Sequence, residues 1–188
     1  MKNSIRIIAG QFRGRKIHFP DSEALRPTPD RVRETLFNWL SPVIADAKCL
    51  DLFAGSGALG FEAVSRGASE VVMIEESFEI AEQLYANRAL LKCDHLEIIQ
   101  QNALEYLAKK ETTFDIIFLD PPFHSTLLEE SLKLIIENHL LNKNGSLYIE
   151  MNKTQNIPDV FGNLRLLKEK KAGQVKYLLC SLNFERCP

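Results

Sequence analysis

After residue 48 the chain alternates short apolar runs with longer segments in which apolar residues repeat at helical spacing. The apolar runs have the length of buried strands and span residues 49–53, 70–75, 96–100, 114–120 and 146–151. The amphipathic segments span residues 58–66, 78–91, 103–110 and 127–138. Strands that alternate with helices are typical of a parallel sheet covered on both faces. The pattern therefore predicts an α/β, Rossmann-like fold with a doubly wound, mostly parallel sheet.

The two ends of the chain lack this alternation and carry short β-rich stretches instead. Residues 4–10 and 15–19 flank a turn, which predicts a small N-terminal β-hairpin. Residues 164–184 contain two β-rich stretches around Ala172-Gly173. They predict an antiparallel hairpin at the edge of the sheet.

Between the N-terminal hairpin and the first buried strand, the chain carries the signals of a helix start. Thr28 is the candidate N-cap, and Pro29 is expected at the first helical position. Apolar side chains then fall on one helical face, at Val32, Leu36, Phe37 and Leu40. We expect an amphipathic helix that packs on the body of the protein.

Composition is that of an ordinary globular protein, with 188 residues of which 45% are hydrophobic and 26% are charged. We expect a single domain over residues 1–188, in which residues 1–25 form an N-terminal extension. No apolar run approaches the ~20 residues that cross a bilayer, and the N-terminus lacks the apolar core of a signal peptide. The four cysteines form no CxxC pair and have no histidine at zinc spacing. We therefore expect a cytoplasmic monomer with no metal site and no membrane contact.

Charge is distributed unevenly along the chain. Residues 1–33 hold eight basic and three acidic side chains, whereas the remaining 155 residues hold 15 basic and 22 acidic ones. A basic segment on an acidic body suits a polyanionic partner such as RNA, because clustered arginines neutralise phosphates. On charge alone, an ordinary solvated surface is an equally good interpretation.

A glycine-rich loop ends the first buried strand and opens the next helix. Gly55, Gly57 and Gly60 satisfy the pattern GxGxxG, which would suit a dinucleotide as well as other nucleoside cofactors. Asp51 favours a different cofactor, since it would repel a pyrophosphate but attract the ammonium group of S-adenosylmethionine. A tight turn without any ligand is the alternative interpretation of the glycines.

Two further polar residues follow the next strands of the predicted sheet. Glu75 ends the second strand, where a carboxylate can accept hydrogen bonds from ribose hydroxyls. Asn102 follows the third strand and could hydrogen-bond the adenine edge, although a helix N-cap is an equally good role for it. The residues predicted to bind S-adenosylmethionine are Asp51, Phe53, Gly55, Gly57, Glu75 and Asn102.

The fourth strand leads directly into the sequence Asp-Pro-Pro-Phe at residues 120–123. An exocyclic base amine is a poor nucleophile, so a catalyst must accept its protons in hydrogen bonds. The Asp120 carboxylate and the Pro121 carbonyl are suitable acceptors, and Pro122 helps to fix the backbone. Phe123 offers a flat face for stacking the target base. The alternative is a strand end followed by a rigid turn.

The glycine-rich loop and residues 120–123 together resemble the amino-methyltransferase branch of class I methyltransferases. Residues 6–17, 25–40 and 172–177 narrow the resemblance to the RsmD family, whose members are bacterial 16S ribosomal RNA guanine-N2 methyltransferases. The similarity covers about residues 4–182, and residues 26–40 are its most family-specific segment. It implies the cofactor and catalytic residues named above, a class I methyltransferase fold, and contact of the N-terminal hairpin and the arginine-rich helix start with RNA. It further implies that the substrate is 16S rRNA in an assembled 30S subunit or late precursor.

The basic residues predicted to contact RNA lie in the N-terminal hairpin and around the first helix. They are Arg13, Arg15, Arg26, Arg31 and Arg33. Surface pairing of the last two with Asp30 and Glu34 is the alternative.

Other functions fit the motifs less well. A methyltransferase for adenine N6 in DNA would be expected to carry a target-recognition insertion, and protein glutamine methyltransferases usually carry Asn where this chain has Asp120. A non-catalytic RNA-binding assembly factor would not need Asp120 and Pro121. An NAD-dependent oxidoreductase is disfavoured by Asp51 and by the lack of a proton-relay set near residues 120–123.

Overall fold

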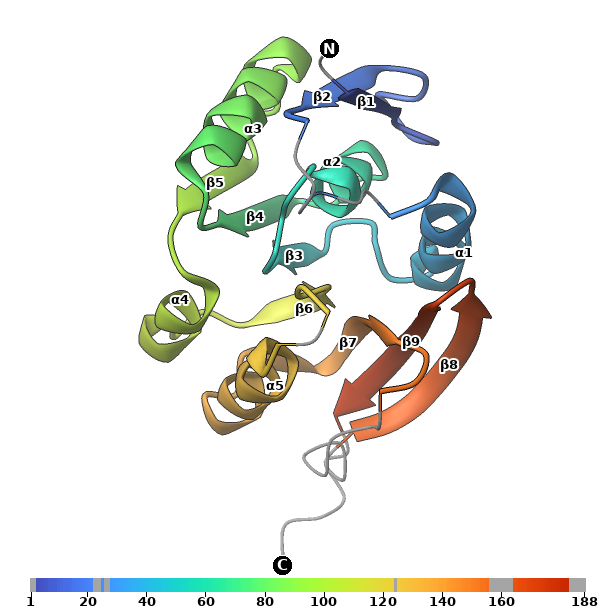
Figure 1. Cartoon of the computed structure of the whole chain (residues 1–188), viewed down its shortest axis with the longest axis vertical. Helices are drawn as coiled ribbons and strands as arrows, with labels where there is room; N and C mark the ends of the chain where they lie inside the picture. The colour runs from blue at the N-terminus through green and yellow to red at the C-terminus, as the bar shows by residue number, and fades with distance from the viewer. Residues whose placement is uncertain (1–2, 22–24, 26–27, 124, 156–163, 183–188) are drawn as a thin grey trace, which may run out of the picture.

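A seven-stranded sheet forms the centre of the computed structural model, which describes residues 3–21, 25, 28–123, 125–155 and 164–182. Its strands are β3 (Lys48–Asp51), β4 (Glu70–Glu75), β5 (Leu96–Gln100), β6 (Phe114–Leu119), β7 (Leu141–Asn152), β8 (Leu164–Ala172) and β9 (Val175–Leu182). The order across the sheet is β5-β4-β3-β6-β7-β9-β8 (Figure 1). Strands β3 to β7 are parallel, while β9 is antiparallel to both β7 and β8. This confirms the predicted sheet and its C-terminal hairpin.

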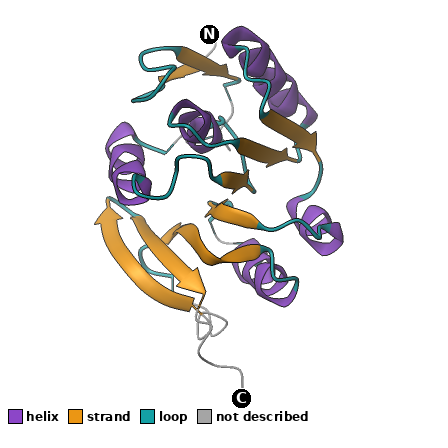
Figure 2. Cartoon of the chain, turned by 180° about the vertical axis from the view of Figure 1, so that it is seen from behind, coloured by secondary structure: helices purple, strands orange, loops and turns teal. Residues whose placement is uncertain are grey.

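Helices cover both faces of the sheet. They are α1 (Asp30–Leu40), α2 (Ala58–Ser65), α3 (Phe78–Leu91), α4 (Ala103–Lys109) and α5 (Leu127–Glu137). Helices α1, α2 and α3 lie on one face and α4 and α5 on the other, as both views show (Figure 1, Figure 2). Two apolar cores result, because the strands bury alternate side chains against the two helix layers. Within the described residues, no helix has the length and apolar character to cross a bilayer.

The strand order places a reversal between β3 and β6. The chain runs outward from β3 through β4 to β5, and then returns to the other side of β3 to form β6. In open α/β sheets, ligands bind at the carboxyl ends of the strands where the order reverses. The topology therefore puts the expected site where the loops after β3 and β6 meet.

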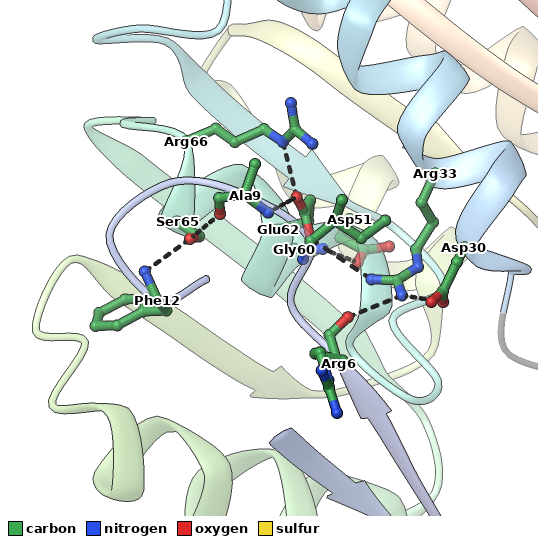
Figure 3. A network of polar contacts seen from close by, with 11 residues as sticks. Arg6, Ala9, Phe12, Asp30, Arg33, Asp51, Gly60, Glu62, Ser65 and Arg66 are labelled. Atoms are coloured by element: carbon green, nitrogen blue, oxygen red, sulfur yellow. Dashed lines mark hydrogen bonds and ion pairs between the residues drawn. The ribbon is translucent and has the colours of Figure 1, made fainter. Parts of the chain in front are cut away.

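The N-terminal hairpin, β1 (Asn3–Arg6) and β2 (Lys16–Phe19), is antiparallel as predicted and packs on the α2 side of the sheet (Figure 1). The carboxylate of Glu62 on α2 accepts hydrogen bonds from the backbone amides of Ile8 at 2.8 Å and Ala9 at 3.1 Å (Figure 3). Gly10 has a φ of +81°, and a Cβ there would lie 1.7 Å from the Ser65 carbonyl oxygen. The hairpin is therefore closely fitted to α2.

Two local expectations are wrong. Pro29, not Thr28, occupies the N-cap position of α1, because its ψ of 147° is extended rather than helical. Thr28 lies one residue further out, and its side chain is buried and hydrogen-bonded to Glu150. Strand β7 begins at Leu141, five residues earlier than the apolar pattern indicates, because Leu141 pairs with Phe114 at the start of β6. The polar residues after Leu141 hide this extension from a pattern based on hydrophobicity.

Candidate functional site

A cavity of about 950 Å³ opens at the carboxyl ends of β3, β4, β6 and β7. The structure brings both predicted groups of residues to it. Five of the six predicted cofactor residues line it, namely Asp51, Phe53, Gly55, Glu75 and Asn102. All four residues of the segment 120–123 line it as well. The loops after β3 and β6 therefore face one cavity, as the strand order requires.

The glycine-rich loop gives this cavity a wall of backbone. Gly55 and Gly57 have backbone φ values of +50° and +77°, which residues other than glycine rarely adopt. Gly57 is the N-cap of α2, and a Cβ there would approach the Phe61 ring to 2.7 Å. Gly57 does not line the cavity, so its observed role is to shape the turn that presents Gly55.

Asp51 lies at the end of β3 with its side chain buried against the first turn of α2. Its Oδ2 accepts a hydrogen bond from the Gly60 amide at 2.9 Å. Burial raises the pKa of Asp51 to about 7, the Gly60 amide opposes this rise, and the Glu75 carboxylate adds to it. An Asp51 carboxylate is therefore costly at this position unless a positive charge lies nearby.

Glu75 is fixed on the opposite side of the glycine-rich loop. Its Oε2 accepts a hydrogen bond from the Gly55 amide at 2.9 Å, and its Oε1 accepts one from the Ser77 amide at 2.8 Å. Each carboxylate oxygen can accept a further bond. The carboxylate is thus held by backbone while it remains able to bind hydroxyl groups in the cavity.

Asn102 is a helix N-cap, as the alternative interpretation of this residue predicted. Its Oδ1 accepts hydrogen bonds from the amides of Leu104 at 3.0 Å and Glu105 at 3.2 Å, so it caps α4. Its Nδ2 donates to Glu76 at 3.3 Å. The capped helix start also forms part of the cavity lining, so capping and ligand contact are compatible at this position.

Asp120 follows β6 and brings a third carboxyl group to the cavity. Its pKa is raised well above the usual range, first by burial and then by the carboxyl groups of Glu150 and Asp51. Pro121 is buried, whereas Phe123 is 38% exposed at the mouth of the cavity. An acceptor group at depth and an aromatic ring at the entrance suit a planar base that enters from outside.

Sequence reasoning missed Glu150, Tyr148 and Thr28. Glu150 is buried near the end of β7 and lines the cavity, as Thr28 does. The hydroxyl of Tyr148 donates a 2.6 Å hydrogen bond to Glu150 Oε1. The one sequence signal that could have indicated Glu150 is that it is a single acidic residue near the carboxyl end of an otherwise apolar stretch.

The arginines predicted to contact RNA divide into three groups. Arg13, Arg15 and Arg31 are exposed, although Arg15 Nη2 also donates to the Leu90 carbonyl at 3.2 Å. Arg26 lies outside the described residues. The predicted RNA contact of Arg33 is wrong, because its side chain is only 1% exposed and cannot reach RNA.

Arg33 instead ties the hairpin to α1 and α2 (Figure 3). Its guanidinium contacts Asp30 at 2.6 Å and Glu62 at 3.5 Å and donates to the Arg6 carbonyl at 3.0 Å. Pairing with Asp30 was the predicted alternative for this residue. The longer-range partners could not be inferred from sequence spacing.

Among the described residues, no group of three or more His, Cys, Asp or Glu side chains is arranged to hold a metal ion. The cavity does fit S-adenosylmethionine. Buried carboxyl groups that raise one another's pKa suit a cofactor with positive charges, and a glycine backbone wall permits close approach.

The doubly wound sheet, its antiparallel C-terminal hairpin and this cavity define a class I methyltransferase that uses S-adenosylmethionine. The chain belongs to the family described as "Conserved hypothetical protein 95", which it matches over residues 5–181 and which corresponds to the RsmD family.

Similar proteins are consistent with this assignment. Ribosomal RNA small subunit methyltransferase D of Escherichia coli strain K12 is 51% identical over 175 residues, which cover 93% of this chain and 88% of the relative. The protein of the same name in Haemophilus influenzae is 48% identical over 184 residues, which cover 95% and 94%. The solved structure of Escherichia coli yhhF has a TM-score of 0.87 and 48% identity, and the match covers 96% of this chain and 98% of that one. The family expectation from the sequence is confirmed.

Proposed function

We propose that this protein transfers a methyl group from S-adenosylmethionine to the exocyclic N2 amine of a guanine in 16S rRNA. The observation that carries the proposal is that the Asp-Pro-Pro-Phe segment lines the same cavity as Asp51 and Glu75. Relatives at 51% and 48% identity are named as methyltransferases of small-subunit ribosomal RNA, which supports the choice of substrate. The proposed setting is the cytoplasm, where a monomer would act on a 30S subunit or late precursor.

The chain's own residues would hold the cofactor at three points. Asp51 would attract its ammonium group, since a nearby positive charge relieves the cost of the buried carboxylate. Glu75 would accept hydrogen bonds from ribose hydroxyls while its backbone contacts keep it in place. Asn102 and Phe53 would border the adenine, and the glycine turn would allow the backbone close to the ligand. When bound, the cofactor supplies an electrophilic methyl group.

The segment after β6 would orient the target amine. An Asp120 carboxylate and the Pro121 carbonyl would accept the two amine protons, which turns the nitrogen lone pair toward the methyl carbon. Pro121 and Pro122 restrict the backbone so that these acceptors keep their direction. Phe123, at the mouth, would stack on the base once it has left its helix or loop.

Recognition of the RNA would fall to exposed arginines of the N-terminal hairpin and of α1. Pro29, directly before α1, lines the cavity, and Arg31 is exposed in the first turn of α1. Arg13 and Arg15 are exposed in the hairpin that packs against α2. Arg31 would bind a phosphate near the entrance, whereas Arg13 and Arg15 would bind phosphates farther along the RNA, because their turn packs on the C-terminal ends of α2 and α3.

Replacement of Asp120 by Asn tests this assignment. It keeps the shape of the side chain but removes the negative charge, so the methyl transfer rate should fall by about 100-fold or more. Affinity for S-adenosylmethionine should stay within a few-fold of wild type, because the loss concerns alignment of the base. The measurements are single-turnover transfer to small subunits and calorimetric titration of the cofactor.

Asp94→Asn is the matched control, since Asp94 is exposed in the turn before β5 at the opposite edge of the sheet. It should transfer at the wild-type rate. Substantial turnover by Asp120→Asn would rule out the catalytic role of residues 120–123.

A further inference from the structure

Strand β7 places a second carboxyl group directly beside Asp120. In the parallel register of β6 and β7, Phe118 pairs with Tyr148 and Leu119 pairs with Ile149, and Asp120 and Glu150 are the residues that directly follow this last pair. Paired residues on parallel strands about 4.8 Å apart project to the same face of a sheet. The rings of Phe118 and Tyr148, one step earlier on that face, are in edge contact at 6.4 Å. Both carboxyl groups line the cavity.

Glu150 is held more firmly than a surface acid would be. It is only 4% exposed, and its Oε1 accepts the 2.6 Å hydrogen bond from Tyr148, whose own side chain is fully buried. The ring of Tyr148 packs at 6.5 Å from that of Tyr177 on β9. The side chain of Thr28, from the segment before α1, also hydrogen-bonds Glu150. Three elements thus fix the position of this carboxyl group.

The groups around the pair do not favour two negative charges. Among the described residues, Asp120 faces Glu150 from the end of β6, Asp51 lies near Asp120 at the end of β3, and the rings of Tyr148 and Tyr177 also neighbour Glu150. Burial raises the pKa of Glu150, while its hydrogen bonds from Tyr148 and Thr28 lower it. Asp120 receives no such lowering contribution, and its pKa is raised further by Glu150. Two adjacent carboxyl groups, of which Glu150 is buried and Asp120 is half-buried, favour a state in which they share one proton.

We propose that Glu150 is a positioning residue that controls the ionisation of Asp120, by sharing one proton with it until a cationic methyl donor binds. This role rests on the proposed function and deepens it. The sulfonium charge of the donor stabilises the doubly ionised pair, and the shared proton leaves to solvent. Asp120 is then a carboxylate when the base amine arrives.

Proton and charge balance follow from this role. During transfer the N–C bond forms as the methyl–sulfur bond breaks, and the electron pair of the broken bond stays on sulfur. The amine N–H bond then breaks, its electron pair stays on nitrogen, and the proton returns to the Asp120–Glu150 pair. Over these two events the sulfonium charge is lost and the pair regains its proton, so the net charge of the site is the same before and after the reaction.

The test counts protons released when ligands bind, and it needs no RNA. Calorimetric titrations near pH 7 in buffers of different ionisation enthalpy give the number of protons exchanged. S-adenosylmethionine should release about one proton, and S-adenosylhomocysteine, which lacks the sulfonium charge, should release close to none beyond the contribution of their shared parts. Comparison of the two ligands cancels the response of Asp51 to the amino group that both carry.

Two variants of Glu150 separate the proposed role from a merely structural one. Glu150→Gln should abolish the difference in proton release between the two ligands and move the acidic limb of the transfer rate to lower pH by about one unit or more. Glu150→Asp, which keeps a carboxyl group, should restore the difference. If Glu150→Gln does not fold, Asp120→Asn removes the other member of the pair and should abolish the same difference.

Equal proton release by both ligands in the wild-type protein, with normal cofactor affinity, would overturn the role of Glu150 and leave the proposed function standing. A difference that persists in Glu150→Gln would overturn it as well. Failure of the wild-type protein to bind S-adenosylmethionine would contradict the proposed function itself.

Discussion

Asp51 shows how a single side chain can serve both the fold and the site. Its hydrogen bond to the Gly60 amide joins the end of β3 to the first turn of α2. A Cβ at position 60 would lie 2.2 Å from the side chain of Met73 and 3.2 Å from Asp51 Oδ2, so glycine is needed for this approach. The same carboxyl group faces the cavity, where its ionisation is costly. The cost is relieved when a cation is bound.

Asp51→Asn should therefore change both cofactor binding and the pH dependence of stability. Loss of the charge should weaken S-adenosylmethionine binding by about 1.5 to 3 kcal/mol, as measured by calorimetric titration. Because the folded-state pKa is raised from 3.8 to about 7, ionisation of Asp51 lowers the free energy of unfolding as pH rises between these values. Relative to wild type, the variant should gain stability over that interval, by an amount on the order of a few kcal/mol.

Urea unfolding of the ligand-free proteins at pH 4 and pH 8 measures this second effect. Exposed Asp94→Asn is again a suitable control and should run parallel to wild type. A constant difference between Asp51→Asn and wild type across the interval would show that Asp51 is not buried as an unfavourable charge.

The sequence predicted correctly which acidic residues line the cavity where each stands at the end of a predicted strand. Asp51, Glu75 and Asp120 each lie at the carboxyl end of a strand, and parallel strands bring their carboxyl ends together. Glu150 escaped because its importance depends on register, which brings it beside Asp120 only once β6 and β7 are neighbours. Spacing along the chain does not contain that information.

At the scale of elements, the N-terminal hairpin is fixed to the body by buried polar contacts. Glu62 is fully buried and accepts hydrogen bonds from two hairpin amides, while it also contacts Arg66 Nε at 2.7 Å and Arg33 Nη1 at 3.5 Å. Ser65 adds a hydrogen bond from the Phe12 amide at 3.0 Å (Figure 3). The hairpin is a rigid extension of α2, so exposed arginines on it have defined positions.

Glu62→Gln should destabilise the protein strongly. The side-chain NH2 group introduced by this substitution would face the hairpin amides or guanidinium groups, which are donors themselves. Arg33 would keep a buried charge without its carboxylate partner on α2. We expect a loss of about 3 to 5 kcal/mol in the free energy of unfolding, measured by urea titration. Glu70→Gln, which removes a half-exposed partner of Lys48, should cost less than about 1 kcal/mol. Similar losses in both variants would contradict the view that Glu62 anchors the hairpin.

The order of the elements was predictable from the sequence, and their ends were less so. Apolar runs that alternate with helical segments indicated β3 to β7, and two β-rich stretches indicated β8 and β9, but the polar start of β7 carries no such signal. Pro29 also misled, since a proline can stand at the N-cap as well as at the first helical position, and its ψ angle decides between them. Arg33 was wrongly predicted to contact RNA, because α2 and the hairpin bury it only in the folded protein and its sequence neighbours give no sign of this.

At the scale of the whole molecule, the basic N-terminal part and the acidic remainder are joined in one rigid body through α1 and α2. Exposed Arg13, Arg15 and Arg31 lie in the part with excess positive charge, whereas the cavity carries the buried carboxyl groups of Asp51 and Glu150 and the half-buried one of Asp120. A negatively charged RNA would be attracted to the first region and repelled by the second. RNA binding and cofactor binding should therefore be separable by mutation.

Replacement of Arg13, Arg15 and Arg31 by Gln should weaken binding to small subunits and flatten its dependence on salt, because fewer counterions are released. The measurement is the slope of log affinity against log salt concentration. Cofactor affinity should remain unchanged, since none of these side chains lines the cavity.

A control variant with Lys109, Lys133 and Lys143 replaced by Gln removes the same charge from exposed positions on α4, on α5 and near the start of β7. It should keep close to the wild-type slope. Equal slopes and affinities for the arginine variant and wild type would show that these arginines form an ordinary solvated surface.

The identity of the methylated product tests the central claim most directly. The purified protein would be incubated with methyl-labelled S-adenosylmethionine and with small subunits that lack the modification, and the rRNA would then be digested to nucleosides. The wild-type protein should place the label in N2-methylguanosine, and Asp120→Asn should reduce this labelling by about 100-fold or more. Label in N6-methyladenosine or in protein, or no transfer by the wild-type enzyme, would contradict it.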